Sequence, residues 1–232
     1  MKPAVRACNK GRFTMLGVIH RDRESEHLLS GWLESFRPDI ITLEFSHYGL
    51  NFREARGAGL RQSVRETVDR LRADGYEVDD KALSDVFSYI DLPAEYTIAS
   101  EYSRRHVARV FLVDMDCLSS SKLAMIDDLL ARENLISLLC GVGQDGPDRR
   151  SGNPERVLAG LFFEKGVKAF TYTREMRVRG EYMRDRIVRL MERYQDSRFL
   201  HICGWQHLYD PYNIYGFLNP TKVFIHDKAF RV

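Results

Sequence analysis

The sequence predicts an α/β protein with an open, mostly parallel central sheet flanked by helices and a helical insertion after the second strand. Short apolar runs alternate with stretches of helical periodicity, which is typical of parallel strands joined by crossover helices. One amphipathic stretch separates the first two runs, about the length that a right-handed parallel crossover needs. The region 51–105 is helical in pattern and highly charged. We therefore expect one α/β domain over residues 1–232, with residues 51–105 as a helical insertion or cap.

A strand, a helix and a second strand form the predicted beginning of the sheet. Residues 13–19 (FTMLGVI) are apolar around a central glycine and predict a buried strand. Ser25 is a suitable N-cap for the helix that follows, in which apolar residues recur at helical spacing. The sequence Arg-Pro-Asp at 37–39 ends that helix. Residues 40–45 (IITLEF) predict the second buried strand.

The rest of the chain continues the alternation after the helical region. Residues 107–113 (VARVFLV) predict a third strand, and the serines at 119–121 can cap a helix that runs to Leu130. Residues 141–154 are rich in glycine, aspartate, proline and arginine and predict a loop, for which we expect a role as a lid or specificity wall. Helices are predicted over 153–163 and 174–194, and strands over 199–203 (FLHIC) and 223–225 (VFI).

Side chains that bind metals or transfer protons follow four of the predicted strands. The sequence Gly-x-x-His occurs at 17–20, where the first strand ends, and again at 204–207, directly after the strand over 199–203. Glu44 ends the second strand and Asp114 follows the third. Because open parallel sheets bind ligands beyond the carboxyl ends of their strands, we expect these side chains to share one edge. A glycine at a strand end lets the backbone turn sharply or approach a ligand closely.

Two histidines and a carboxylate are a suitable ligand set for a divalent metal. His20, Glu44 and His207 leave coordination positions open for water when they bind zinc, manganese, cobalt or iron. Metal-bound water is acidified and becomes a nucleophile, so the chemistry indicated is hydrolysis. Two alternatives stay open. Either Glu44 acts as a general base on the water instead of binding the metal, or the motif residues have purely structural roles.

The order of these motifs is that of a known superfamily. Residues 13–50 contain a strand, Gly-x-x-His, a helix, Arg-Pro-Asp, an apolar strand and a glutamate. Residues 95–116 contain a helix and a strand that ends in aspartate, and residues 174–208 contain an Arg…Tyr-Met helix, a strand and the second Gly-x-x-His. These segments resemble the TraB/Tiki superfamily, which includes erythromycin esterase-like, haem-binding ChaN-like and TraB/PrgY-related proteins.

The resemblance implies roles for particular residues of this chain. It implies that His20, Glu44 and His207 form the metal or catalytic centre. It places Asp114 near that centre, and it implies that Arg179 projects toward the centre from the late helix. An arginine in that place binds a substrate carboxylate or stabilises an oxyanion.

Two features beside the predicted site have more than one interpretation. The chain has Val178 where many members of the superfamily have a glutamate before the helix arginine, and Glu175, one turn earlier, is the candidate substitute. Residues 21–23 (Arg-Asp-Arg) directly follow His20. They predict a solvated turn, with orientation of His20 as the alternative.

The sequence and the resemblance together predict a metal-dependent hydrolase that cleaves an amide or ester bond in a small molecule or peptide. Here the divalent metal is the cofactor, and Glu44, Asp114 and Arg179 are catalytic. The alternative is a ligand-binding protein without turnover, with haem as the cofactor and the two motif histidines as axial ligands. A third hypothesis is a regulatory or interaction domain whose contact face is the arginine-rich helix at 174–198.

Composition and charge exclude other classes of protein. The chain of 232 residues is 44% hydrophobic and has a formal net charge of +2, so we expect neither disorder nor a nucleic-acid partner. Its apolar runs fall short of the roughly 20 residues of a membrane span, and no signal-peptide pattern precedes Gly17. We therefore expect a cytoplasmic protein without a membrane partner. The cysteines lack zinc-finger spacing and are predicted to be reduced, and the oligomeric state stays open.

Overall fold

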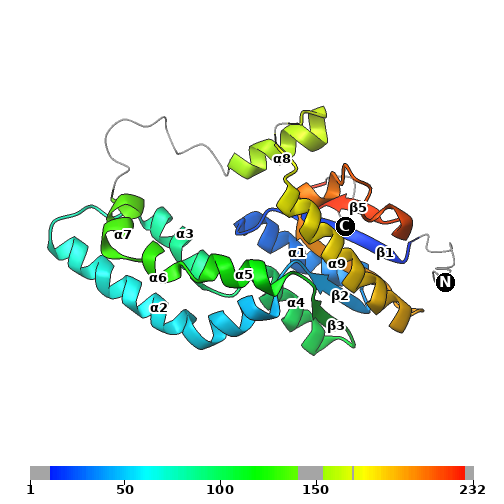
Figure 1. Ribbon diagram of the computed structural model, residues 1–232, viewed down its shortest axis with the longest axis horizontal. Helices are drawn as coiled ribbons and strands as arrows, with labels where there is room; N and C mark the ends of the chain where they lie inside the picture. The colour runs from blue at the N-terminus through cyan, green and yellow to red at the C-terminus, as the bar shows by residue number, and fades with distance from the viewer. Residues whose placement is uncertain (1–10, 141–153, 169, 228–232) are drawn as a thin grey trace.

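A parallel sheet lies at the centre of the computed structural model, which describes residues 11–140, 154–168 and 170–227. The five strands of the sheet run in the order β3-β2-β4-β1-β5, and every neighbouring pair is parallel (Figure 1). The predicted α/β fold class is therefore confirmed. The strands are β1 (Phe13–Val18), β2 (Ile40–Leu43), β3 (Arg109–Leu112), β4 (Phe199–Gly204) and β5 (Thr221–Phe224).

The late strand β4 lies between the two early strands β1 and β2. At their carboxyl ends, Val18 of β1 is level with Gly204 of β4, and Leu43 of β2 is level with Ile202 of β4. Every residue of these three strands is buried, as continuous apolar strands are when helices cover both faces of a sheet. The ends of β3, β2, β4 and β1 are therefore neighbours along one edge.

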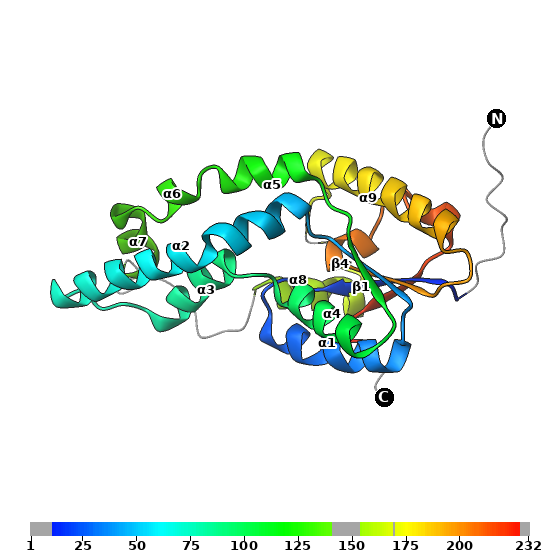
Figure 2. The same ribbon diagram turned by 90° about the horizontal axis from the view of Figure 1, so that it is seen from below.

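Helices cover both faces of the sheet (Figure 2). The helices α1 (Arg23–Phe36) and α4 (Ala94–Arg105) lie on one face, and α9 (Arg174–Arg193) lies on the other. Met183 and Ile187 of α9 belong to the hydrophobic core under the sheet. Their spacing of four places both on the same face of the helix. The remaining elements of this part are α8 (Pro154–Lys165), η1 (Trp205–Leu208) and η2 (Gly216–Leu218).

Asp22 is the N-cap of α1, so the prediction that Ser25 caps this helix is wrong. The carboxylate of Asp22 accepts a hydrogen bond from the backbone N–H of Ser25 at 2.9 Å. A carboxylate also favours the positive end of the helix dipole, and Arg156 donates to both oxygens of Asp22. Asp22 is buried whereas Arg21 and Arg23 are exposed, so the prediction of a solvated turn at residues 21–23 is wrong for Asp22.

A helical arm extends away from the sheet (Figure 1). Its buried residues, among them Val64, Val68 and Leu135, form a hydrophobic cluster separate from the core under the sheet. The arm combines segments from before and after β3. The helix α4 lies within the expected insertion at 51–105, but it packs on the sheet and is not part of the arm. The helical arm consists of α2 (His47–Ala73), α3 (Asp80–Ile90), α5 (Asp116–Leu123), α6 (Ile126–Leu129) and α7 (Arg132–Leu139).

Several sequence predictions concern parts of the chain outside the described residues. These parts include Cys8 and nearly all of the predicted loop at 141–154. The other cysteines, Cys117, Cys140 and Cys203, are free thiols. Among the described residues, no helix has an apolar and nearly uncharged stretch of the length that crosses a membrane.

We predict that Gly17→Ala lowers the free energy of unfolding by about 1–3 kcal/mol. A Cβ atom on Gly17 would lie 2.9 Å from the Cα atom of Trp205, so the backbone after β4 would have to shift. Gly31→Ala in α1 is the matched control, because a Cβ atom there meets nothing within 4 Å and alanine stabilises a helix interior by about 0.5–1 kcal/mol. Urea unfolding measures both variants, and equal stabilities contradict the close approach at Gly17.

Candidate active site

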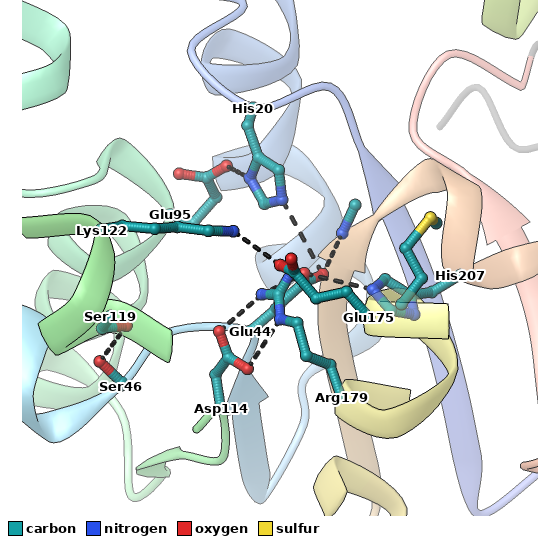
Figure 3. Close-up of polar contacts among 12 residues, drawn as sticks. His20, Glu44, Ser46, Glu95, Asp114, Ser119, Lys122, Glu175, Arg179 and His207 are labelled. Atoms are coloured by element: carbon teal, nitrogen blue, oxygen red, sulfur yellow. Dashed lines mark hydrogen bonds and ion pairs between the residues drawn. The ribbon is translucent and has the colours of Figure 1, made fainter. Parts of the chain in front are cut away.

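The order of the strands brings together the four side chains that the sequence placed at strand ends (Figure 3). His20 follows β1, Glu44 follows β2 and Asp114 follows β3. His207 lies in η1, directly after β4. Because β4 lies between β1 and β2, His20 from the beginning of the chain and His207 from near its end both lie beside Glu44.

The carboxylate of Glu44 is buried at the centre of this group. One oxygen, Oε1, lies 2.7 Å from Nη2 of Arg179 and 3.2 Å from Nε2 of His207. The other oxygen, Oε2, accepts a hydrogen bond of 2.7 Å from the backbone N–H of Gly204. Burial alone raises the pKa of a carboxyl group, but the charges of His207 and Arg179 outweigh it and hold the pKa of Glu44 well below its usual range. Glu44 is therefore an anion.

Arg179 connects Glu44 to Asp114. Its Nε donates to Oδ1 of Asp114 at 3.1 Å and its Nη2 donates to Oδ2 at 2.6 Å, so the pair is bidentate. Burial opposes the charged form of Arg179, but Glu44 and Asp114 outweigh it and raise the pKa of the guanidinium. Asp114 therefore holds the arginine in place (Figure 3).

His20 pairs with a carboxylate that the sequence did not reveal. Its Nδ1 lies 2.7 Å from Oε1 of Glu95, which belongs to the first turn of α4. Its Nε2 lies 3.9 Å from Oε2 of Glu44, too far for a hydrogen bond. Burial lowers the pKa of His20, but Glu44 and Glu95 outweigh it and raise the pKa above its usual value. The side chain is 45% exposed and is accessible to a ligand.

His207 differs from His20 in exposure and in its contacts. Its side chain is 3% exposed, and its Nε2 faces Glu44. Its Nδ1 is buried and has no hydrogen-bond partner among the described residues. Because Nε2 faces an ionised carboxylate, it carries the proton and donates to Glu44. The role that this geometry gives to His207 is to stabilise the charge of Glu44.

The glycines of the two Gly-x-x-His motifs allow the motifs to pack against each other. A Cβ atom on Gly204 would lie 3.1 Å from Nε2 of His20, and Gly17 has the backbone of Trp205 as its neighbour. Each glycine thus makes room for the other motif. The repeated pattern is explained by this mutual contact at adjacent strand ends.

A cavity of about 510 Å³ opens beside this edge of the sheet. His20, Glu44 and Arg179 line it, together with residues of the helical arm and the start of α4. His207 is not among the residues that line it. The volume is that of a small-molecule site, and the lining mixes acidic and basic side chains.

The side chains of this site do not fit a three-ligand metal centre as they are arranged. Both oxygens of Glu44 are already engaged, and His207 directs its protonated Nε2 at them. No group of three or more histidine, cysteine or acidic side chains in the described parts of the chain is arranged to hold a metal ion. The positive charge beside Glu44 comes from Arg179. A divalent metal on His20, Glu44 and His207 stays a prediction.

The cavity also lacks the features that haem requires. A haem macrocycle is largely apolar and needs apolar walls, whereas charged side chains such as Arg21, Arg53 and Glu26 line this cavity. Axial ligation needs free imidazole nitrogens that face the iron, and Nε2 of His207 faces Glu44 instead. Haem binding by His20 and His207 is therefore not favoured by the geometry.

Other residues near the site were predicted incompletely or missed. Glu175, the candidate substitute for the glutamate missing at Val178, pairs with Lys122 of α5 at 2.7 Å. Glu95 was missed because nothing in the sequence near Pro93 signals that the first turn of α4 reaches β1; only the packing of α4 on the sheet brings it there.

Comparison with known proteins adds no family to this description: no protein-family model, curated protein or solved structure matches the chain. The resemblance to the TraB/Tiki superfamily rests on the segments quoted above and stays a prediction.

We predict that Arg179→Met lowers the free energy of unfolding by about 3–5 kcal/mol, because it leaves two buried carboxylates without their shared counter-ion. These carboxylates are Glu44 and Asp114. Arg177→Met is the matched control on the same helix, where the arginine pairs with Glu181, whose side chain is 39% exposed. Chemical unfolding compares the two variants with the wild type. A loss of stability no larger for Arg179→Met than for Arg177→Met contradicts the central role of this ion pair.

We predict that His20 titrates above the ordinary histidine value of 6.5 and that Glu95→Gln lowers its pKa, since the carboxylate stabilises the imidazolium. The contribution of protonated His20 to stability is thus present below pH 6.5 and is lost as the pH rises through the raised pKa. His201 is the internal reference, because burial lowers its pKa to about 4. NMR titration of the imidazole signals measures both, and a His20 value at or below 6.5 contradicts the Glu95 pairing.

Proposed function

We propose that this chain hydrolyses an ester or amide bond of a small molecule or peptide, with His20 as the general base that activates water. The observation that carries the proposal is the pairing of His20 with Glu95 at 2.7 Å on the wall of a cavity of about 510 Å³. A histidine that is oriented by a carboxylate and exposed to a ligand site is suited to proton transfer.

The Glu95 pair determines which nitrogen of His20 takes the proton. Nδ1 donates to Glu95, so the unprotonated nitrogen of the neutral ring is Nε2. Because Glu44 and Glu95 raise the pKa of His20 to about 10, the neutral ring that acts as the base forms as the pH rises toward that value, and we expect kcat/KM to increase with pH over this range. Nε2 takes a proton from water as the water oxygen attacks the carbonyl carbon. The imidazolium that forms lies between Glu95 and Glu44, which stabilise its charge. The same proton then goes to the leaving oxygen or nitrogen, so His20 ends the cycle neutral.

Arg179 is the candidate stabiliser of the tetrahedral intermediate. It lines the cavity, and its Nη1 makes no hydrogen bond to another described residue. Asp114 and Glu44 hold the guanidinium in position before the substrate arrives. A positioned cation aimed at a developing oxyanion lowers the barrier without the cost of reorganisation.

Glu44 has a structural and electrostatic role in this proposal. A carboxylate with a strongly lowered pKa is a weak base, so the assignment of Glu44 as general base is less favourable than the assignment of His20. Glu44 keeps Arg179 in the site and stabilises positive charge on His20. The metal-dependent mechanism expected from the sequence uses the same cavity and remains the alternative for the activation of water.

Turnover of p-nitrophenyl acetate and of a p-nitroanilide tests the proposal. We expect His20→Ala to lower kcat/KM by about 10²–10⁴-fold, the range for loss of a general base, and Glu95→Gln to lower it less. The matched control is His106→Ala, because His106 also pairs with a carboxylate, Glu34 at 3.2 Å, but does not line the cavity. Equal turnover by wild type, His20→Ala and His106→Ala contradicts the proposal.

Elemental analysis of the same preparations separates the two ways of activating water. The protein is purified without a metal-affinity column. If it is active and contains no stoichiometric metal, the result supports His20 as the base. Near-stoichiometric zinc, manganese, cobalt or iron that is lost in both His20→Ala and His207→Ala assigns these histidines to a metal and overturns the role of His20 as base.

A further inference from the structure

Two arginines that line the cavity form no ion pair with any acidic side chain that the structure describes. Arg53 of α2 donates from Nε to the carbonyl of Asp91 at 3.1 Å, from Nη1 to that of Gly49 at 3.2 Å and from Nη2 to that of Tyr89 at 3.3 Å. The guanidinium of Arg21 lies 4.6 Å from the centre of the Tyr89 ring. Within the described residues, neither arginine forms an ion pair with a carboxylate.

The acidic side chains that share this cavity do not pair with these two arginines in the described structure. The side chain of Asp91 pairs with Arg61 of α2. Glu95 pairs with His20. Glu26 lines the same cavity but forms no ion pair with either arginine in the described structure. In the parts of the chain that the structure describes, no carboxylate forms an ion pair with Arg21 or Arg53.

The fixed position of Arg53 makes it suitable for recognition. Its three hydrogen bonds to carbonyls hold the guanidinium plane in place. A guanidinium has five N–H donors, so one N–H on each Nη atom is left for a ligand. Burial lowers the pKa of Arg53 and the charge of Arg21 adds to this effect, as expected for a cation that lacks a counter-ion.

We propose that Arg21 and Arg53 bind an oxyanion, a carboxylate or a phosphate, on the ligand that occupies this cavity. A guanidinium binds two oxygens of a carboxylate or of a phosphate through two parallel N–H donors. Together with the proposed function, on which this step rests, the site selects an anionic substrate. The scissile bond lies at His20 and Arg179, and the charged group lies at Arg21 and Arg53 of the same cavity.

Calorimetric titration with sodium phosphate and with sodium succinate, at constant ionic strength, tests the oxyanion site without any turnover. We expect saturable binding of at least one anion to the wild type and to His20→Ala. Arg53→Gln and Arg21→Gln weaken that binding by about tenfold or more. Arg53→Lys keeps the charge but loses the fork of donors, so its affinity lies between those of wild type and Arg53→Gln.

Arg56→Gln and Arg23→Gln are the matched controls. Each removes one positive charge close in the sequence to one of the proposed binding arginines. Arg56 pairs with Asp127 and Arg23 donates to Ser84, and neither lines the cavity. Both controls keep wild-type affinity if the site is specific. No saturable binding of either anion, or equal losses in Arg53→Gln and Arg56→Gln, overturns the oxyanion site. Stronger binding of phosphate or of succinate identifies which oxyanion the site prefers.

A pair of esters connects the oxyanion site to catalysis. The p-nitrophenyl monoester of succinate carries a free carboxylate, and p-nitrophenyl butyrate is a neutral ester of the same acyl length. We expect Arg53→Gln to lower kcat/KM for the succinate ester alone. Equal effects on both esters overturn the selection of an anionic substrate. Anion binding that depends on Arg53, in a chain that hydrolyses neither ester, supports the oxyanion site and contradicts the proposed hydrolysis.

Discussion

Glu44 carries a carboxylate that is buried at the carboxyl end of the sheet, and the arrangement of the site follows from how this charge is compensated. A buried anion is costly unless it is both paired and hydrogen-bonded. Arg179 of α9 supplies the charge, and the backbone N–H of Gly204 supplies the hydrogen bond. Asp114 after β3 binds the other side of the same guanidinium. One ionised group thus ties β2, β3, β4 and α9 together, and Glu44 and Arg179 of this group line the cavity.

The cavity has two walls of different origin. His20 and Glu44 follow the carboxyl ends of β1 and β2, strands whose residues are all buried in the sheet. The helical arm supplies Arg53, and its own hydrophobic cluster holds it together independently of the sheet. This division suits a site in which the sheet positions the reacting groups and the arm recognises the rest of the ligand. Rigid elements hold catalytic geometry more accurately than loops do.

The sequence predicted the sheet and most of the polar side chains at its edge because both depend on local features. A strand that is buried on both faces must be apolar throughout, so β1, β2 and β4 are visible as short apolar runs. In a parallel sheet all carboxyl ends lie at one edge, so His20, Glu44 and Asp114 could be placed together before their contacts were known. The repeated glycine pattern was also visible, although its cause was not: Gly17 packs against Trp205, and Gly204 packs against His20.

The partners of these residues were decided only by the tertiary structure. Glu95 reaches His20 because α4 packs on the sheet, and Arg53 lines the cavity where the start of the helical arm meets the ends of β1 and β2. The sequence suggested a metal as the positive charge beside Glu44, whereas the structure places Arg179 there. Periodicity and strand ends are properties of neighbouring residues, so the sequence alone determined the elements and their chemically active ends. Ion pairs between distant segments depend on how those elements pack, and packing leaves no periodic signal in the chain.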